Sequence, residues 1–323
     1  MRPYSRVYAT VNLDAVASNM RSMRDNLPAS TLIMGSVKAD GYGHGSVPVA
    51  KTIEPYVFGY AVATIDEGII LRRHGINKTI LILGVTHESR YEDLLRYDIR
   101  TAMFQYEKAK KLSDLALKQG KKAVVHLALD TGMSRIGMKA DREHAKEAAA
   151  IAALEGIEVE GLFTHFARAD ETDKSAYEEQ YRRYKEFLGY LKELGVKIPI
   201  RHCSNSAGIV ESLESNHMDM VRAGIAIYGM YPSDEVDHNS VKLTPAMEIK
   251  SCITYIKEIE AGTAVRPYHE SSNHSCRLWR WLCPFPFRKR RCADPRQESS
   301  YFRPYLHGSV YGRCNRYPGC TGR

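Results

Sequence analysis

The sequence predicts an α/β protein built on a (β/α)8 barrel of the TIM type. Eight short apolar runs alternate with helical segments over about 200 residues, between positions 31 and 229. Distinctive polar residues fall at the ends of several of these runs, where barrel enzymes carry their chemistry. An open doubly wound sheet is the alternative on pattern alone. Its dinucleotide-binding version is disfavoured, because no Gly-x-Gly-x-x-Gly turn follows a strand.

The predicted strands are short runs of apolar residues bounded by turn signals. They cover residues 31–37, 57–61, 79–83, 101–104, 124–129, 159–164, 198–203 and 220–227. We expect them to form one parallel sheet, because a helical segment separates each strand from the next.

Two of the intervening helices begin with the pattern of a capping box. Thr64 with Glu67 is the first, and Ser175 with Glu178 is the second. The second helix has apolar residues at spacings of three and four, which predicts one buried face. This face consists of Tyr177, Tyr181, Tyr184, Leu188 and Leu191, and Gly195 is placed to end the helix.

Composition divides the chain near residue 266. From Arg266 onward there are twelve Lys and Arg residues against three Asp and Glu, whereas the preceding part has 34 against 35. Five of the seven cysteines and both tryptophans also lie in this tail. We expect three parts: the barrel in residues 1–235, the first part of a C-terminal β-domain in 236–265, and a separate tail in 266–323.

The sequence predicts a cytoplasmic protein. Arg2 and Arg6 flank only short apolar stretches, so the N-terminus does not read as a signal peptide. No apolar run approaches the length of a membrane span.

The segment Val37-Lys38-Ala39-Asp40-Gly41-Tyr42-Gly43-His44 is the most informative part of the chain. Lys38 ends an apolar run and is followed at once by a turn rich in glycine. Partial desolvation lowers the pKa of a lysine in such a position, and a neutral amine can form a Schiff base. The structural alternative is a solvated lysine at the end of a strand.

Four further segments place polar residues after later strands. Arg135 follows the fifth strand in Asp-Thr-Gly-Met-Ser-Arg-Ile-Gly, and His165 ends the sixth in Phe-Thr-His-Phe. Asn205 and Ser206 follow the seventh in His-Cys-Ser-Asn-Ser-Ala, and Arg222 lies at the eighth in Met-Val-Arg-Ala-Gly-Ile. Each has an ordinary alternative: a surface ion pair for Arg135, a core histidine for His165, a helix cap for Ser206, and a salt bridge between Arg222 and Asp219.

These five segments, in this order and spacing, resemble the motifs of the alanine racemases, which are barrel enzymes that use pyridoxal phosphate (PLP). The resemblance covers residues from about 5 to 265 and implies interconversion of L-alanine and D-alanine, which supplies D-alanine for peptidoglycan. Lys38 would hold PLP covalently and act as one of two acid–base groups. Tyr42 would donate a hydrogen bond to the phosphate, and no metal is implied.

The resemblance also implies the remaining site residues. Ser206, with the backbone N–H groups of Gly224 and Ile225, would complete the phosphate cradle, and Asn205 would be a further cofactor-binding residue. Arg135 would reach the phenolic oxygen of the cofactor and the substrate carboxylate. Arg222 would face the pyridine nitrogen, with His165 supporting that arginine or the ring.

An arginine opposite the pyridine nitrogen has a physical consequence. A guanidinium only donates hydrogen bonds, so the nitrogen stays unprotonated and the ring is a weaker electron sink than in enzymes that place a carboxylate there. One residue departs from the family pattern. Many members have a lysine that can be carbamylated two residues before the Asp of Asp-Thr-Gly-Met, and this chain has Ala128 there. Arg135 then lacks that negative partner.

The sequence of the tail indicates translation in a shifted reading frame. Family members have a Gly-Tyr-(Ala/Gly)-Asp-Gly motif and later an Ile-Cys-Met-Asp-Gln motif, and neither is present here. Residues 276–281 can be encoded by TGT CGG CTA TGG CGA TGG, which reads Val-Gly-Tyr-Gly-Asp-Gly one nucleotide later. Residues 306–315 can be encoded so that the same shift gives Cys-Met-Asp-Gln-Phe-Met-Val-Asp-Val-Thr. We infer a frameshift between about residues 265 and 276, and an out-of-frame tail has no reason to fold, so we expect it to be disordered.

The frameshift predicts an impaired product. In the family, the tyrosine of the first missing motif is the second acid–base residue and acts in the partner subunit's site. The β-domain forms much of the contact of the homodimer expected for the intact family, so its loss weakens that expectation here. Substrate choice stays open between alanine and serine or another small amino acid.

Two hypotheses from other functional classes remain. One is a non-catalytic PLP-binding barrel protein. The other is a tail that forms a genuine basic and aromatic module for single-stranded nucleic acid or a membrane surface. The tail cysteines show no Cys-x-x-Cys spacing, so zinc is weakly supported. The family resemblance favours an enzyme without a nucleic-acid or membrane partner.

Overall fold

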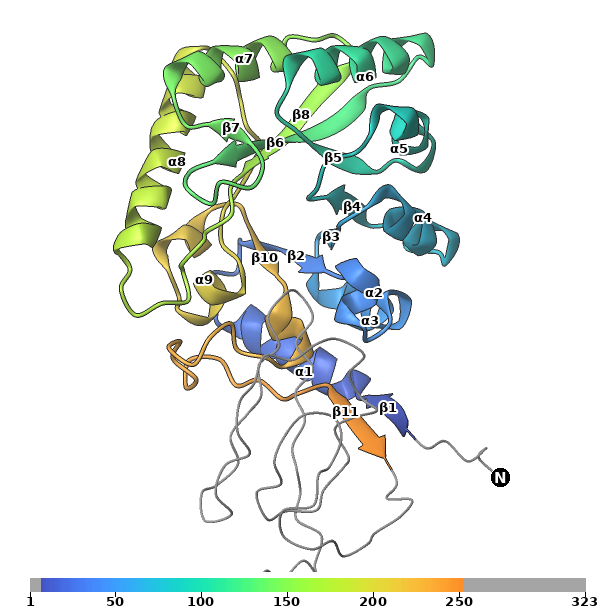
Figure 1. The fold of residues 1–323 in the computed structure, drawn as a ribbon, viewed down its shortest axis with the longest axis vertical. Helices are drawn as coiled ribbons and strands as arrows, with labels where there is room; N and C mark the ends of the chain where they lie inside the picture. The colour runs from blue at the N-terminus through green and yellow to red at the C-terminus, as the bar shows by residue number, and fades with distance from the viewer. Residues whose placement is uncertain (1–6, 252–323) are drawn as a thin grey trace, which may run out of the picture. The chain divides into compact units, whose positions relative to one another are not determined.

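The computed structural model describes residues 7–251 (Figure 1). These residues belong to two compact units. The larger unit is Asn12–Ala246. The smaller one contains the strands β1 (Val7–Val11) and β11 (Met247–Ser251). The predicted division at residues 235 and 265 stays a prediction, and the tail 266–323 lies outside the described residues.

The larger unit is a barrel of eight parallel strands, as predicted. The strands are β2 (Leu32–Ser36), β3 (Gly59–Val62), β4 (Thr79–Ile82), β5 (Arg100–Met103), β6 (Ala123–Asp130), β8 (Ile157–Phe163), β9 (Ile200–His202) and β10 (Met220–Ala223). Their order in the sheet is β10-β2-β3-β4-β5-β6-β8-β9. The Arg222 N–H donates to the Ser204 carbonyl oxygen at 3.0 Å, which joins β10 to the residues after β9 and brings the two ends of the sheet together.

Helices surround these strands (Figure 1). They are α1 (Leu13–Asp25), α3 (Ser46–Ile53), α4 (Ile65–Arg73), α5 (Tyr91–Tyr97), α6 (Tyr106–Lys118), α7 (Arg142–Ala152), α8 (Ser175–Glu193) and α9 (Ser206–Val210). Within residues 7–251, no helix combines the length and the apolar character needed to cross a membrane.

The two predicted capping boxes have different outcomes. Thr64 caps α4 as predicted, because its hydroxyl oxygen accepts the Glu67 N–H at 3.4 Å, but the Glu67 carboxylate accepts the Ala63 N–H and not that of Thr64. The prediction at Ser175 is wrong: this residue is the first of α8, its N-cap is Lys174, and that N-cap makes no side-chain cap bond. The buried face of α8 follows the predicted tyrosines, but Phe187 is fully buried where the sequence analysis chose Leu188.

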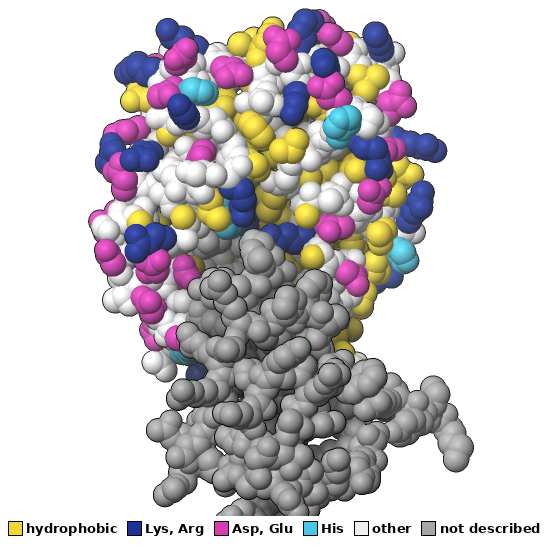
Figure 2. Space-filling model, viewed as in Figure 1, with side chains coloured by type: hydrophobic (Ala, Val, Ile, Leu, Met, Phe, Trp, Pro, Cys, Tyr) yellow, Lys and Arg dark blue, Asp and Glu magenta, His cyan; other side chains and the backbone are white. Residues whose placement is uncertain are grey.

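Buried apolar side chains of the barrel strands form two clusters. One buried cluster consists of Met34, Ala61, Leu81 and Met220, and another of Ala102, Ala128 and Phe163. On the outside, acidic and basic side chains are interspersed over the face seen in Figure 2. A surface of mixed sign agrees with the near balance of charges before residue 266.

The smaller unit is a two-stranded antiparallel ladder. Strand β1 pairs with β11 so that Ala9 lies opposite Ile249. Strand β11 lies within residues 236–265, where the start of a β-domain was expected, whereas β1 was not predicted. A short strand that pairs with a partner more than 200 positions away carries no local signal of its pairing.

Candidate functional site

The predicted cofactor lysine lies where β2 leaves the barrel. Lys38 begins the short turn α2 (Lys38–Tyr42). Residues 39–43 all have positive φ, from 50° to 82°, so this segment is a left-handed turn. Left-handed backbone costs about 1–2 kcal/mol for each residue that carries a side chain. The surroundings must therefore hold the turn.

Two carboxylates hold this turn. One Glu67 oxygen accepts the Ala39 N–H at 3.0 Å, and the other accepts the Ala63 N–H at 2.8 Å. Asp40 accepts the Ser46 N–H at 2.8 Å. Glu67 thus ties the residue after the lysine to the start of α4, which restricts the backbone on which Lys38 is mounted.

The Lys38 amine is partly desolvated. Burial lowers its pKa, and the positive charge of Arg135 lowers it further; Glu67 opposes this effect and Arg222 adds to it. The amine lies 5.7 Å from the centre of the Tyr42 ring. A lysine in this environment has a larger neutral fraction than a solvated one, and the neutral form is the one that attacks an aldehyde.

Hydroxyl groups converge at Gly224, directly after β10. The Gly224 N–H donates to Ser206 Oγ at 2.9 Å. A Cβ at position 224 would lie 3.3 Å from Tyr42 Oη, 3.6 Å from Ser206 Oγ and 4.0 Å from Ser36 Cβ. Three side chains that carry hydroxyl groups therefore surround the space beside Gly224, and Gly224 has no side chain to fill it. Donors arranged in this way suit an anion such as a phosphate.

Ser36 was not among the predicted site residues. Its side chain is 5% exposed, and its Oγ forms no well-aligned hydrogen bond with the described residues. It is close enough to Tyr42 to lower the pKa of that phenol, but burial outweighs this effect and the net pKa of Tyr42 is raised. Tyr42 therefore stays protonated and can donate. The only sequence signal for Ser36 is a serine in an otherwise apolar strand.

The capping alternative for Ser206 is wrong. Asn205 is the N-cap of α9, and its side-chain oxygen accepts the Gly208 N–H at 3.1 Å. The Ser206 hydroxyl instead faces the end of β10, where it also lies 3.4 Å from the Ala226 N–H. Asn205 therefore shapes the turn that presents Ser206. A direct contact of Asn205 or of the Ile225 N–H with a cofactor stays a prediction.

Arg222 is held by neutral acceptors inside the barrel. One terminal nitrogen donates to the His202 carbonyl oxygen at 2.9 Å and lies 3.0 Å from His202 Nδ1. The other donates to the carbonyl oxygens of Thr164 and Cys203 at 2.7 and 3.0 Å, and lies 3.4 Å from His165 Nδ1. Burial lowers the pKa of Arg222 to about 10, so it stays charged at neutral pH.

The salt bridge considered for Arg222 does not form. Asp219 pairs with Arg201 instead, with nitrogen–oxygen distances of 2.6 and 2.9 Å. His202 supports Arg222 at a shorter distance than the predicted His165, and His202 was not among the predicted site residues. The signal available was a histidine at the end of a strand, in the same segment as Asn205 and Ser206.

Arg135 lies in the loop after β6. It is exposed, and none of the residues 7–251 forms a hydrogen bond or an ion pair with it. Its charge nevertheless lowers the pKa values of Lys38, Tyr42 and Arg222, which associates this loop with the other site residues. Ala128 is 1% exposed and packs against apolar side chains, so it supplies no negative partner for Arg135.

The Arg135 loop depends on a glycine. A Cβ at Gly137, whose φ is +116°, would lie 2.7 Å from the backbone nitrogen of Asp130. We expect Gly137→Ala to lower the free energy of unfolding by about 1–3 kcal/mol, because it adds a backbone clash to an unfavourable φ. Urea unfolding measures this. Gly120→Ala is the control, since Gly120 also has positive φ but no atom within 4 Å of its Cβ position. An equal loss in both variants would contradict the role of the close approach.

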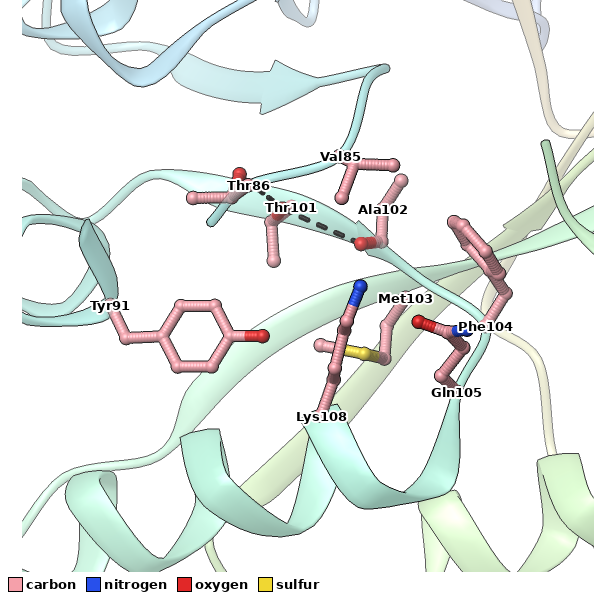
Figure 3. A pocket seen from close by; sticks show the side chains of 9 residues that line it. All are labelled: Val85, Thr86, Tyr91, Thr101, Ala102, Met103, Phe104, Gln105 and Lys108. Carbon is pink, nitrogen blue, oxygen red and sulfur yellow. Dashed lines mark hydrogen bonds between the residues drawn. The ribbon is translucent and has the colours of Figure 1, made fainter. Parts of the chain in front are cut away.

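Two cavities elsewhere contain none of the predicted site residues. The one in Figure 3 has a volume of about 10 Å³ and is lined in part by Thr86 and Thr101, whose hydroxyls lie 2.9 Å apart. It has room for about one water molecule. A larger one of about 390 Å³ lies near the start of β5 and β6, lined by residues such as Asp98 and Lys121. In the described part of the chain, no group of three His, Cys, Asp or Glu could hold a metal.

Comparison with known proteins points to one family. The family "Alanine racemase, N-terminal domain" matches residues 11–232. An alanine racemase of Desulforamulus reducens is 43% identical over 260 residues, which cover 80% of this chain and 70% of that protein. The solved structure of a Clostridium difficile alanine racemase in complex with cycloserine is 42% identical, with a TM-score of 0.77 over 80% of this chain and 71% of that one. The Bacillus anthracis enzyme with bound L-Ala-P is 32% identical, with a TM-score of 0.75 over 84% and 69%.

Proposed function

The chain belongs to the alanine racemase family, and we propose from this premise that its barrel binds PLP and interconverts L-alanine and D-alanine. The observation that carries the proposal is the combination of a partly desolvated lysine after β2 with a hydroxyl cradle after β10. Strands β2 and β10 are neighbours, and Ala223 lies opposite Gly35. The aldehyde and the phosphate of one small cofactor therefore have partners at the same edge of the barrel. The D-alanine formed would serve peptidoglycan synthesis.

Different residues would bind the aldehyde, the phosphate and the ring nitrogen of PLP. Lys38 would bind the aldehyde carbon of PLP. Tyr42 and Ser206 would donate hydrogen bonds to its phosphate, and Ser36 is a third hydroxyl nearby. Gly224 would leave space for the phosphate, because it has no side chain. Arg222 would donate to the ring nitrogen. When bound, PLP supplies an electron-withdrawing ring that acidifies the Cα–H bond of an amino acid.

Proton transfer would fall to two groups on opposite faces of the substrate. Lys38 would remove or deliver the Cα proton on one face. Arg135 would hold the substrate carboxylate. Racemisation also needs an acid–base group on the other face, and in the family this is the tyrosine of a C-terminal motif. We propose that residues 266–323 are out of frame and lack this group, so that the racemase activity is impaired.

The extent of the matches supports a change of frame. They cover about 80% of this chain and about 70% of the length of the relatives, so about 30% of each relative has no counterpart in the aligned part. The composition changes near residue 266, and both family motifs missing from the tail are compatible with one shift of one nucleotide. A homodimer and a cytoplasmic location remain predictions.

The cradle is tested by the difference between PLP and pyridoxal, which lacks the phosphate. We expect Ser206→Ala to weaken PLP binding by roughly 10- to 100-fold, because a hydrogen bond to a charged group contributes about 1.5–3 kcal/mol. Pyridoxal binding should hardly change. Absorbance titration measures both affinities, and the exposed Ser89→Ala serves as control. Equal losses for the two aldehydes would contradict a phosphate contact.

The lowered pKa of Lys38 predicts how its reaction with PLP depends on pH. Near neutral pH a larger fraction of Lys38 is unprotonated than of an ordinary lysine, so it should react faster than the exposed Lys51. The advantage should shrink as the pH approaches 10.5, the ordinary lysine value, because solvated amines then become neutral as well. Timed reduction with borohydride followed by peptide mapping gives both rates. A ratio of rates that does not change with pH would contradict the prediction.

A further inference from the structure

A line of hydrogen-bonded side chains runs from Arg222 across the barrel interior. His202 Nδ1 lies 3.0 Å from the Arg222 guanidinium, and His202 Nε2 lies 2.8 Å from His126 Nδ1. His126 Nε2 lies 2.9 Å from a carboxylate oxygen of Glu160. These four residues come from β10, β9, β6 and β8, and the two histidines are fully buried.

The chemistry of the two ends allows one direction of donation. A guanidinium only donates, so the bond with Arg222 favours a neutral His202 ring that accepts at Nδ1 and carries its proton on Nε2. That N–H donates to His126 Nδ1, which places the proton of His126 on Nε2. The Glu160 carboxylate, which only accepts, receives this last N–H. Burial lowers the pKa values of both histidines, which favours neutral rings.

The strand pairing leaves room for this arrangement. His126 lies opposite Gly161 of β8, and a Cβ at position 161 would lie 2.5 Å from His126 Nδ1. A side chain there would displace the ring from its bond with His202. Gly161 and Glu160 are adjacent in sequence, so one strand both makes space for His126 and supplies its acceptor.

Through the two histidines, Glu160 is the carboxylate that is linked by hydrogen bonds to Arg222. The direct acceptors of Arg222 are carbonyl oxygens and imidazole nitrogens, none of them charged. Burial alone would raise the pKa of Glu160, but the bond from His126 and the charge of Arg100, 3.5 Å away, outweigh it and keep that pKa below its ordinary value. The carboxylate therefore stays ionised and remains an acceptor at neutral pH.

We propose that Glu160 is a positioning residue for Arg222: through His126 and His202 it fixes the direction of the hydrogen bonds, so that His202 always offers a lone pair to the guanidinium. If the line reversed, His202 Nδ1 would carry a proton, and two donors would face each other at Arg222. The direction of the bonds is a property of the chain itself. Its consequence, a guanidinium held ready to donate to a pyridine nitrogen, rests on the proposed function.

Nitrogen NMR of the protein labelled with ¹⁵N-histidine tests this without any cofactor, so its result is independent of the proposed function. In the native chain we expect His126 and His202 to carry their protons on Nε2, with both Nδ1 atoms unprotonated. Glu160→Gln should preserve this pattern, because the amide oxygen can accept the same bond. Glu160→Leu removes the acceptor and should give a mixture of tautomers at both histidines. Glu158→Leu, at an exposed position of the same strand, should leave the spectrum unchanged.

Two results would overturn the proposal. The first is a proton on Nδ1 of either histidine in the native chain, a result that needs no variant to fold. The second is a Glu160→Leu spectrum with the native tautomers at both rings, which would show that Arg222 alone directs the bonds.

Discussion

Lys38→Ala is expected to abolish covalent attachment of PLP. The reason is geometric: Lys38 is mounted on the strained turn next to the cradle formed by Tyr42, Ser206 and Gly224, so a neighbouring lysine cannot take its place without moving the backbone. Native protein and variant would be incubated with PLP, passed through a desalting column, and compared by the absorbance of the retained cofactor.

Lys51→Ala is the matched control for this experiment. Lys51 is an exposed residue of α3, a short distance along the same chain segment. It should retain as much PLP as the native chain. If Lys38→Ala retained an equal amount after reduction with borohydride, the attachment would be at another lysine and the assignment of the site would be wrong.

Restoring the reading frame near codon 265 is expected to raise the rate of alanine racemisation by about 10²–10⁴. This is the usual contribution of one general acid–base group, and the restored frame would return the tyrosine that delivers or removes a proton opposite Lys38. The measurement compares the conversion of L-alanine to D-alanine by the two forms, each saturated with PLP.

The control is Lys38→Ala in the restored form, which should return the rate to the baseline. Equal racemase activity in the original and restored chains would mean that residues 266–323 serve the enzyme as they stand, and the frameshift hypothesis would fail. A restored chain that is inactive but still attaches PLP would instead favour a non-catalytic PLP-binding protein.

The barrel was predictable because most of its strands are buried along nearly their whole length. Such strands read as short continuous apolar runs, and all eight are present within a few residues of their predicted limits. Local conformation was harder to predict. The glycines at positions 41 and 43 indicate a turn, but the left-handed backbone of Ala39, Asp40 and Tyr42 depends on bonds such as the one that the Ala39 N–H donates to Glu67.

Contacts between distant strands explain what was missed at the site. His202, His126 and Glu160 lie on three different strands, and only the register of the sheet brings their side chains into one line. A buried histidine in an apolar run shows that a partner is needed, but it does not show which one. The predicted cap at Ser175 was wrong for a local reason. The residue types fit a capping box, but Ser175 is already the first residue of the helix.

The most direct test of the site is chemical trapping on the unmodified chain. Reconstitution with PLP at neutral pH, reduction with borohydride and peptide mapping should place most of the cofactor on the peptide that contains Lys38, with much less on exposed lysines such as Lys51. An unlabelled Lys38 peptide from protein that is shown to be folded would contradict the assignment.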